Sequence, residues 1–541
     1  MKKNIKSKKR RLLFMPLFFI LLLIILIGRL VNIQIIECSK YKEGLSNQSV
    51  AVLSGLKGRG IIYDRSGNYL TGMEESFVFL LEKRKVNETV EVLLEKENAR
   101  KLNHTNPLYN LYSITSPNRE VRNILCKDYD ALIIKVRERY QEIQPAIHVI
   151  GYVNKQDETG VCGIEKDFDA ILSSVKKAYY GQADGQGYLI PGFGINIKGE
   201  SGDWGVLTTL DLEFQKIAER VLFDAGVSGA VIITDSANGE ILASASSPVY
   251  NPHQIVDYLQ SSEKEFLNKA TNCQYPPGSI FKIIVAAAAL EKGVVTPNSI
   301  FTCTGYHEVE GISVKCSTGG KQGHGEITLR EAFAQSCNAV FVQVGQLAGG
   351  EDILDMARTF GLSEEPVIDL SGQGSGNLPL REEVLGAGIG NLSIGQGKLL
   401  VTPMQVARMT QIIAADGIDC GLTLIRGTIE GIKGKILLSP PAAKQVISRE
   451  TARAIKEMMM QTVMTGTGDN LALSPGLSAA GKTGSAEAFY EENSSVHSWF
   501  TGFVPADCPQ YCITVFIENG GSGRKAAVPI FQKIIEEINF D

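Results

Sequence analysis

A basic and then apolar N-terminus restricts the fold of this chain more than any other feature. Residues 1–11 carry seven Lys and Arg side chains and no acidic one. Residues 12–27 contain no charged residue, and a shorter apolar stretch, residues 30–36, follows Arg29. A membrane-spanning helix needs about 20 apolar residues. The segment reaches this length if the Arg29 side chain extends toward the aqueous interface, so the pattern predicts one transmembrane helix.

A cleaved signal peptide is the alternative interpretation of this N-terminus. Such a peptide ends in a small-x-small cleavage site, and the sequence has none after the apolar run. We therefore expect an uncleaved, single-pass anchor whose basic end stays in the cytoplasm, because positive charge is retained on that side of the membrane. The rest of the chain would then lie outside the cell membrane, in an extracellular or periplasmic compartment.

The rest of the chain has the composition of a soluble protein. Its net charge is about −12 once the seven N-terminal cations are set aside from the overall −5, which argues against nucleic-acid binding. A length of 541 residues allows two or three domains. We expect a basic tail and anchor at 1–40, a mixed region at 41–205 and a further domain at 206–541. The glycine-rich stretch 181–205 predicts a loop or linker between the last two.

Residues 206–541 show the pattern of an α+β domain. Helical periodicity alternates with strand-like runs, and the turn-rich segment 235–239 indicates a hairpin. Three strand-like runs near the C-terminus, separated by turn signals, predict an antiparallel meander. The expected helices are 212–225, 283–290 and 526–538, and the expected strands are 229–234, 240–245, a run that begins at Lys482, 498–504 and 511–517.

The segment 275–282, Tyr-Pro-Pro-Gly-Ser-Ile-Phe-Lys, carries the first candidate for catalysis. Two prolines and a glycine predict a tight turn, and the apolar run that follows predicts a buried helix. Ser279 and Lys282 are three residues apart and therefore share a helix face. A serine nucleophile needs an adjacent base, and apolar surroundings favour the neutral, basic form of lysine. The bare Ser-x-x-Lys pattern is weak, and it recurs in polar stretches at Ser39, Ser174 and Ser261.

Two further polar clusters extend the candidate site. Ser336 and Asn338, at the expected end of a helical segment, offer a hydroxyl and an amide to a polar substrate. The run Lys482-Thr483-Gly484-Ser485 opens a predicted strand, in which a glycine lets a substrate backbone approach and pair with the strand. Lys482 would supply positive charge for a substrate carboxylate and would help to keep Lys282 neutral.

In this order, the Ser-x-x-Lys, Ser-x-Asn and Lys-Thr-Gly motifs resemble the signature of penicillin-recognising active-site serine enzymes. Ser279 and Ser336 are 57 residues apart, and Ser336 and Lys482 are 146 residues apart. The segment 59–67, Arg-Gly-Ile-Ile-Tyr-Asp-Arg-Ser-Gly, resembles the pedestal motif of class B, monofunctional penicillin-binding proteins. No segment resembles the glycosyltransferase motif of class A members. Further segments similar to the family are Pro276-Pro277-Gly278, His324-Gly325 and His497-Ser498-Trp499-Phe500.

The resemblance implies a membrane-anchored α+β protein. Its parts would be a pedestal, or dimerisation-type, domain at 41–205 and a penicillin-binding transpeptidase domain at 206–541, with an antiparallel sheet flanked by helices. It also implies a peptidoglycan D,D-transpeptidase that cross-links stem peptides ending in D-Ala-D-Ala in cell-wall synthesis. β-Lactams would acylate the same serine. The implied partner is a membrane-embedded glycan polymerase, and no metal or organic cofactor is implied.

The resemblance assigns a role to each candidate residue. Ser279 would attack the penultimate D-Ala carbonyl, and Lys282 would be the base that activates it. Ser336 would relay a proton toward the leaving amine, with Lys482 close by, and Asn338 would orient the substrate amide. On the substrate-binding strand, Thr483 would hold the terminal carboxylate together with Lys482, and Gly484 would admit the substrate backbone. The backbone N–H groups of Ser279 and Ser485 would form the oxyanion hole, although Ser485 stands where Thr is common.

Three other functions use the same pattern. A D,D-carboxypeptidase would transfer the acyl group to water, and a β-lactamase would need a base that activates a deacylating water. A β-lactam sensor or scaffold would fit the anchor but would not require all three motifs intact. We find no glutamate in a motif that would mark a deacylating base. The large pedestal offers a surface to an assembly partner, which favours the transpeptidase.

Ten cysteines and six histidines lack the spacing of a zinc site, because the chain has no C-x-x-C or H-E-x-x-H. We therefore expect no metal, and we interpret His324 and His497 as structural. Cys303 and Cys316 are close enough in sequence to form a disulfide in an oxidising compartment, although free buried thiols are expected for most of the ten. One hypothesis is that a Cys316–Cys337 disulfide distorts the site and switches it off. The simpler interpretation of Cys337 is a small buried filler.

Overall fold

The computed structural model describes the chain except residues 1, 38–49, 53–57, 103–105, 155–156, 176–177, 191–194, 199–202, 318–321, 364–367, 491–492 and 541. The chain divides into two compact units that are interleaved in sequence, and the domain boundary after residue 205 stays a prediction. The first unit comprises Met1–Gly58, Glu75–Val136 and Lys176–Glu200, and the second comprises Arg59–Glu74, Arg137–Val175 and Ser201–Asp541.

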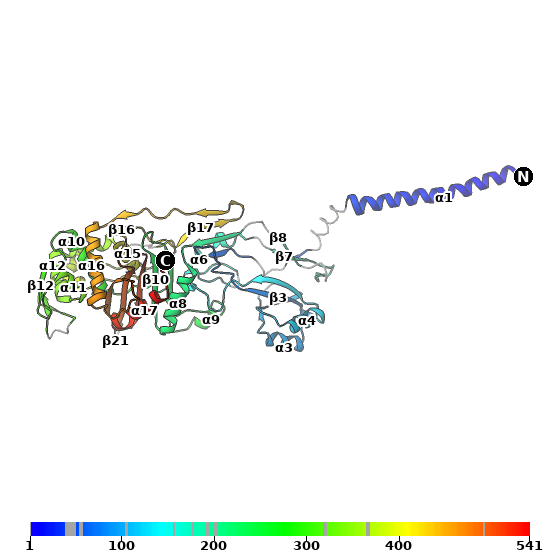
Figure 1. The fold of residues 1–541 in the computed structure, drawn as a ribbon. Helices are drawn as coiled ribbons and strands as arrows, with labels where there is room; N and C mark the ends of the chain where they lie inside the picture. Colours follow the sequence, from blue (N-terminus) through cyan, green and yellow to red (C-terminus); the bar gives the residue numbers. More distant parts are fainter. Residues whose placement is uncertain are drawn as a thin grey trace. The chain divides into compact units, whose positions relative to one another are not determined.

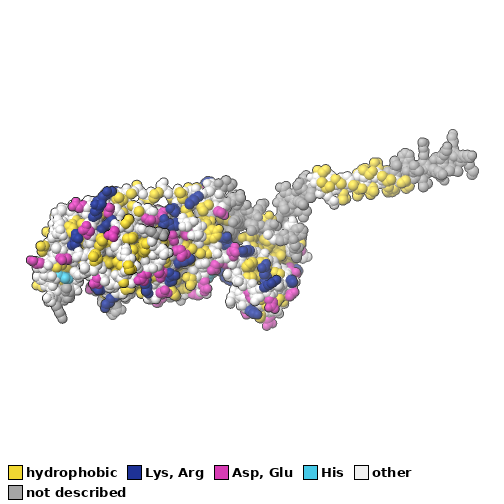
Figure 2. All heavy atoms as spheres, viewed as in Figure 1, with side chains coloured by type: hydrophobic (Ala, Val, Ile, Leu, Met, Phe, Trp, Pro, Cys, Tyr) yellow, Lys and Arg dark blue, Asp and Glu magenta, His cyan; other side chains and the backbone are white. Residues whose placement is uncertain are grey.

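The N-terminal segment is helical. Helix α1 spans Lys2–Val31 and continues as a short π-helical turn, η1, at Asn32–Ile36 (Figure 1). The stretch Phe18–Ile36 is long and apolar enough to cross a membrane, and it is the only such helix among the described residues. Its hydrophobic side chains are exposed along its length (Figure 2). This apolar helix agrees with the predicted single anchor.

A four-stranded antiparallel sheet forms much of the first unit. The strands lie in the order β4-β5-β3-β6, and helices α3 and α4 bury an apolar stripe against the sheet. On the helices this stripe consists of Val90, Leu94, Val121 and Leu125. The bounds are β3 Glu75–Glu82, α3 Glu88–Lys96, β4 Arg100–Lys101, β5 Tyr109–Ile114, α4 Arg119–Lys127 and β6 Leu132–Arg137.

The glycine-rich stretch 181–205 is not the loop that the sequence predicted. It contains part of strand β7 (Ala178–Gln182), strand β8 (Ile195–Lys198) and the start of β9 (Trp204–Thr208). Strands β1 (Val50–Val52), β7 and β8 form a small antiparallel sheet. The turn residues close tight turns between paired segments: Asp184 Oδ1 accepts hydrogen bonds from the backbone N–H groups of Gln186 and Tyr188. Glycine content therefore marked turns rather than a linker.

A five-stranded antiparallel sheet organises the second unit. Its order is β11-β10-β22-β21-β20, so the three C-terminal strands form the predicted meander and β20 lies at the edge. Helices α8 and α17 cover one face of the sheet, and the other face packs against a mainly helical core that contains α10, α12 and α16. The bounds are α8 Leu212–Ala225, β10 Gly229–Asp235, β11 Ile241–Ser247, α16 Arg449–Thr465, β20 Ala480–Tyr490, β21 Asn493–Val504, β22 Tyr511–Ile517 and α17 Gly523–Glu537. The predicted α+β class, with an antiparallel sheet flanked by helices, is confirmed.

The segment 59–67 belongs to the second unit and forms the predicted strand and turn. Strand β2 (Ile61–Tyr63) pairs in parallel with β9, within a four-stranded sheet completed by β17 (Ile425–Glu430) and β18 (Lys435–Leu437). Asp64 Oδ1 accepts from the N–H groups of Ser66 and Asn68 and so closes the turn. Arg59, just before β2, forms an ion pair with the fully buried Glu165 of helix α6 (Gly163–Asp167) at 2.6 Å.

Candidate active site

The candidate nucleophile lies in a short 3₁₀ helix. This element, η3, spans Gly278–Phe281 and leads into α10, Lys282–Glu291. Residues i and i+3 lie one above the other in a 3₁₀ turn, so the three-residue spacing places Ser279 and Lys282 on one side of the element. Ser279 is partly exposed, whereas the Lys282 side chain is fully buried. No hydrogen bond between described residues joins the Ser279 hydroxyl to the Lys282 amine.

Contacts from two directions hold this turn in place. Trp499 of β21 donates from Nε1 to the Pro276 carbonyl at 3.1 Å, and the Gly278 N–H donates to the Gly395 carbonyl at 2.9 Å. Gly278 has a φ of +56°, and a Cβ added there would lie 2.7 Å from the Ser485 carbonyl oxygen. A glycine is therefore required for the turn to pack directly against strand β20.

Ser336 and Asn338 lie at a junction between two helices. The sequence had predicted that they end a single helical segment. Helix α11 spans Leu329–Ala334 and α12 spans Asn338–Ala348, so Asn338 begins the second helix. Ser336 has a φ of +53°, a backbone conformation that is uncommon outside glycine and is concentrated at functional sites. The break lets side chains on both sides of Cys337 face the nucleophile helix.

Lys282 joins the first two motifs. Its Nζ donates to the Ser336 carbonyl at 2.7 Å, to Ser336 Oγ at 3.2 Å and to Asn338 Oδ1 at 2.7 Å. It also lies 5.4 Å from the centroid of the Phe341 ring. Three residue types that the sequence had singled out separately, Ser, Lys and Asn, are thus brought into one hydrogen-bonded group.

The two lysines of the site are both buried, and burial lowers their pKa values. The pKa of Lys282 falls to about 7, so that a large fraction of its amine is neutral near physiological pH. The pKa of Lys482 lies well below its usual value because of burial and, secondarily, repulsion from Lys282. Lys482 Nζ donates to the Thr483 carbonyl at 3.2 Å and lies 5.5 Å from the centroid of the Phe333 ring.

Strand β20 carries the third motif along the edge of the sheet. Thr483 pairs with Phe500 and Ser485 with Ser498 on β21, which leaves the other side of β20 for η3. A Cβ added at Gly484 would lie 3.0 Å from Ile280 Cγ2, so a glycine allows this approach. Ser485 is exposed, and its Oγ accepts from the Gly523 N–H at 3.1 Å.

One side chain of this site was not found from the sequence. The hydroxyl of Thr467 lies 2.5 Å from the Thr483 hydroxyl, which is nearly buried. The only sequence signal at this position is the local Thr-Gly-Thr-Gly run at 465–468, which also fits an ordinary turn. Thr467 orients the Thr483 hydroxyl through this contact.

The cysteine and histidine predictions have mixed outcomes. Cys38 lies outside the described residues, and none of the other nine cysteines forms a disulfide. His497 is structural, as expected: it is fully buried, accepts from the Asn519 N–H at Nδ1 and packs edge-on against Tyr275. His324, in contrast, lies within a group whose other members are Cys303, Cys316 and Cys337. The four residues offer ligand atoms within 4.8 Å of one another, so this group has the donor set of a metal site.

Comparison with known proteins assigns the family. A family model described as penicillin binding protein transpeptidase domain matches residues 229–536. The chain belongs to the penicillin-binding protein transpeptidase family. It is 30% identical to stage V sporulation protein D of Bacillus subtilis, over 98% of this chain and 85% of that protein. It is 26% identical to the peptidoglycan D,D-transpeptidase MrdA of Haemophilus influenzae, over 95% of this chain and 89% of that protein.

Solved structures of penicillin-binding proteins share the fold. A chain from a peptidoglycan synthase complex superposes with a TM-score of 0.74 at 26% identity, over 97% of this chain and 98% of the other. A chain from the Helicobacter pylori complex of penicillin-binding protein PBP2 with MreC gives a TM-score of 0.67 at 23% identity, over 90% and 98%. The curated relatives, stage V sporulation protein D and MrdA, place the chain among the class B, monofunctional members, as the motif resemblance had indicated.

Proposed function

We propose that this protein is a peptidoglycan D,D-transpeptidase that cross-links stem peptides through an acyl-enzyme on Ser279 and that β-lactams acylate the same serine. The observation that carries the proposal is the contact of Lys282 Nζ with both Ser336 Oγ and Asn338 Oδ1, one turn from Ser279. Apo structures often hold catalytic hydrogen bonds loosely. The lack of a hydrogen bond between the Ser279 hydroxyl and the Lys282 amine, both of which belong to the described residues, is therefore compatible with a pair that forms this bond when substrate binds.

The proposed reaction starts with proton transfer from Ser279 Oγ to the neutral amine of Lys282. The serine oxygen then bonds to the carbonyl carbon of the penultimate D-Ala, and the C–N bond to the terminal D-Ala breaks. Ser336 passes its proton to the departing amine and takes up the proton held by Lys282, so that Lys282 is neutral again. An amine of a neighbouring stem peptide next attacks the ester carbonyl and forms the cross-link as the bond from Ser279 Oγ to the acyl carbon breaks, and the proton lost by this amine returns to Ser279.

The substrate is proposed to lie along β20. Its backbone would pair with this edge strand along the side that faces η3. Lys482 and the Thr483 hydroxyl would hold the terminal carboxylate, and Asn338 would orient the substrate amide. The N–H groups of Ser279 and Ser485 would stabilise the oxyanion, and such a donor contributes about 10²–10³ in rate in other acyl-transfer enzymes.

The same proposal places the protein in the membrane and gives it a partner. Helix α1 would anchor the chain with its basic end in the cytoplasm and the catalytic unit outside. One solved relative comes from a complex that couples polymerization and crosslinking, and another is bound to MreC. By analogy, we expect a membrane-embedded glycan polymerase as a partner of this chain.

Mass spectrometry of the full-length protein in detergent, incubated with a penicillin, tests the proposal. We expect one long-lived adduct on Ser279 that is absent in Ser279→Ala. Ser261→Ala is the matched control, because Ser261 lies in another Ser-x-x-Lys pattern that is only partly buried. An adduct that disappears within seconds would instead support a β-lactamase, and its absence from folded protein would support a scaffold.

The acceptor distinguishes the two remaining enzymes. With a peptide ending in D-Ala-D-Ala, release of D-Ala together with a cross-linked product in the presence of an acceptor amine supports the transpeptidase. Release of D-Ala with only hydrolysed peptide, whatever amine is added, would support the D,D-carboxypeptidase.

A further inference from the structure

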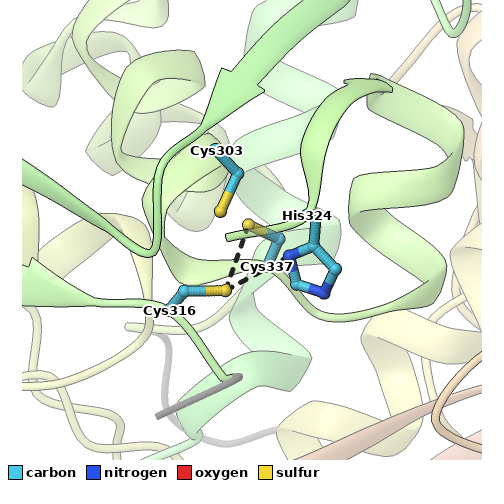
Figure 3. A group of neighbouring side chains, drawn as sticks. All are labelled: Cys303, Cys316, His324 and Cys337. Atoms are coloured by element: carbon cyan, nitrogen blue, oxygen red, sulfur yellow. Dashed lines mark hydrogen bonds between the residues drawn. The ribbon is translucent and has the colours of Figure 1, made fainter. Parts of the chain in front are cut away.

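Four side chains from separate elements point toward one another beside the candidate active site (Figure 3). Cys303 ends strand β12 (Ile300–Cys303), and Cys316 directly follows β14 (Ile312–Lys315). His324 directly precedes β15 (Gly325–Thr328), and Cys337 is the residue before α12. The three cysteines are buried, with at most 4% of their surface exposed, and His324 is partly buried.

Two separations between donor atoms fit a tetrahedral zinc site, and all four donor atoms lie within 4.8 Å of one another. Cys316 Sγ lies 3.6 Å from Cys337 Sγ and 3.3 Å from His324 Nδ1. Bond lengths of about 2.3 Å to sulfur and about 2.0 Å to nitrogen place two sulfurs about 3.8 Å apart, and a sulfur and a nitrogen about 3.5 Å apart, around tetrahedral zinc. Both separations agree with these values to a few tenths of an ångström. We propose that Cys303, Cys316, His324 and Cys337 bind one zinc ion.

A disulfide explains this arrangement less well. A sulfur–sulfur bond is about 2.05 Å long, far shorter than the separation of Cys316 and Cys337. One disulfide would also leave a third buried cysteine and an imidazole directed at the same point. Three cysteines and one histidine are a regular ligand set of structural zinc sites, in which all four positions are filled by protein.

The local backbone supports a preformed site. Strands β12 and β15 pair antiparallel, with Cys303 opposite Gly325, and this pairing brings His324 to the end of β12. A Cβ added at Gly323 would lie 1.8 Å from the Cys303 carbonyl oxygen, so only glycine permits the chain to pass there. The N–H groups of Cys316 and Cys337 donate to the carbonyls of Gly305 and Ala332, each at 2.8 Å.

The proposed ion has a consequence for catalysis, which rests on the proposed function. Cys337 lies between Ser336 and Asn338, and Asn338 Nδ2 donates to the carbonyl of Lys315, next to Cys316. An ion held by Cys316 and Cys337 would therefore fix the segment that places Ser336 and Asn338 in contact with Lys282. The four ligands are positioning residues. A displacement of about 1 Å at such a segment costs about 100-fold in rate.

Metal analysis of the full-length protein, purified in detergent without chelator, tests the binding itself. We expect about one zinc per chain, and a loss of zinc in Cys316→Ala. Cys512→Ala is the matched control, because Cys512 is equally buried but lies on β22, and this variant should keep its zinc. Reduced apoprotein should bind added Co²⁺ with thiolate-to-cobalt charge-transfer absorption, a signature that a merely structural cysteine cluster would not produce.

Two outcomes would overturn the proposal even if the variants fail to fold. One is wild-type protein that contains no zinc and, after reduction, binds neither Zn²⁺ nor Co²⁺. The other is a Cys316–Cys337 disulfide in the isolated native protein, which would support a redox switch instead. Because metal content is measured without β-lactam, this result is independent of Ser279 acylation.

Removal of zinc should slow penicillin acylation about 100-fold, and Zn²⁺ addition should restore it.

Discussion

Lys282 donates from Nζ to Asn338 Oδ1 at 2.7 Å, and this hydrogen bond connects the nucleophile helix to the start of α12. An uncharged amide suits this position. It orients the amine without the charge stabilisation that a carboxylate would give to the ammonium form.

The acylation rate should therefore follow the protonation of Lys282. Burial lowers the pKa of this amine to about 7. Only the neutral amine can accept the serine proton, so the second-order rate constant for penicillin acylation should rise about tenfold per pH unit below pH 7 and level off above it. Stopped-flow measurements between pH 5 and 9 check this dependence. A rate that stays constant between pH 5 and 7 would contradict the role of Lys282 as base.

Asn338→Asp should shift the pH dependence of acylation to higher pH. A carboxylate so close to Lys282 stabilises the ammonium form, so the pKa of Lys282 should rise by about 1–3 units. About half of the wild-type amine is neutral at pH 7, so acylation at this pH should fall roughly 5- to 500-fold by the same shift and should recover partly at higher pH. Asn338→Ala is the comparison, because it loses the contact without adding charge. If both variants show the same midpoint, the electrostatic argument is wrong.

Gly278→Ala should disable the nucleophile turn. The substitution combines a left-handed backbone conformation with a contact at 2.7 Å to the Ser485 carbonyl, so we expect a stability loss of about 1–3 kcal/mol and a larger loss of acylation. Gly293→Ala is a matched control, since its φ of +70° is similar but nothing lies within 4 Å of the added Cβ. Thermal melting and acylation rates of the Gly278→Ala and Gly293→Ala variants measure the effects on stability and on acylation. Equal effects on acylation would mean that close packing against β20 is unimportant.

Glu165→Ala should destabilise the second unit strongly. This fully buried carboxylate accepts from Arg59 Nε at 2.6 Å, Arg139 Nε at 2.6 Å and the Tyr140 hydroxyl at 2.8 Å. Its removal leaves the guanidinium groups of Arg59 and Arg139, which are little exposed, without the carboxylate that they share. Such a change lowers the free energy of unfolding by about 3–5 kcal/mol.

An exposed ion pair provides the comparison for Glu165. Glu351 pairs with Arg381, and about half of each side chain is exposed. Glu351→Ala should cost less than about 1 kcal/mol. Urea unfolding of both variants measures the difference, and comparable midpoints would show that the buried network contributes little.

Short-range patterns were sufficient for much of this protein. Apolar periodicity predicted helix α8 over its full range, and proline, glycine and aspartate predicted the turns at Asp64 and Gly278, because these residues restrict the backbone locally. Likewise, the first two of the three ordered motifs named the residues that Lys282 brings together. The junction at Ser336 was missed, since a helix break of a few residues leaves the apolar periodicity on both sides nearly unchanged.

The donor cluster was decided only by the tertiary structure. Cys303 and His324 become neighbours because β12 pairs with β15, and Cys337 joins them because α12 begins beside Cys316. Ligand spacing along the chain reveals a metal site only when the ligands share a local turn or helix. Here strand pairing and helix packing bring the four ligands together, and neither leaves a signature in the spacing of cysteines.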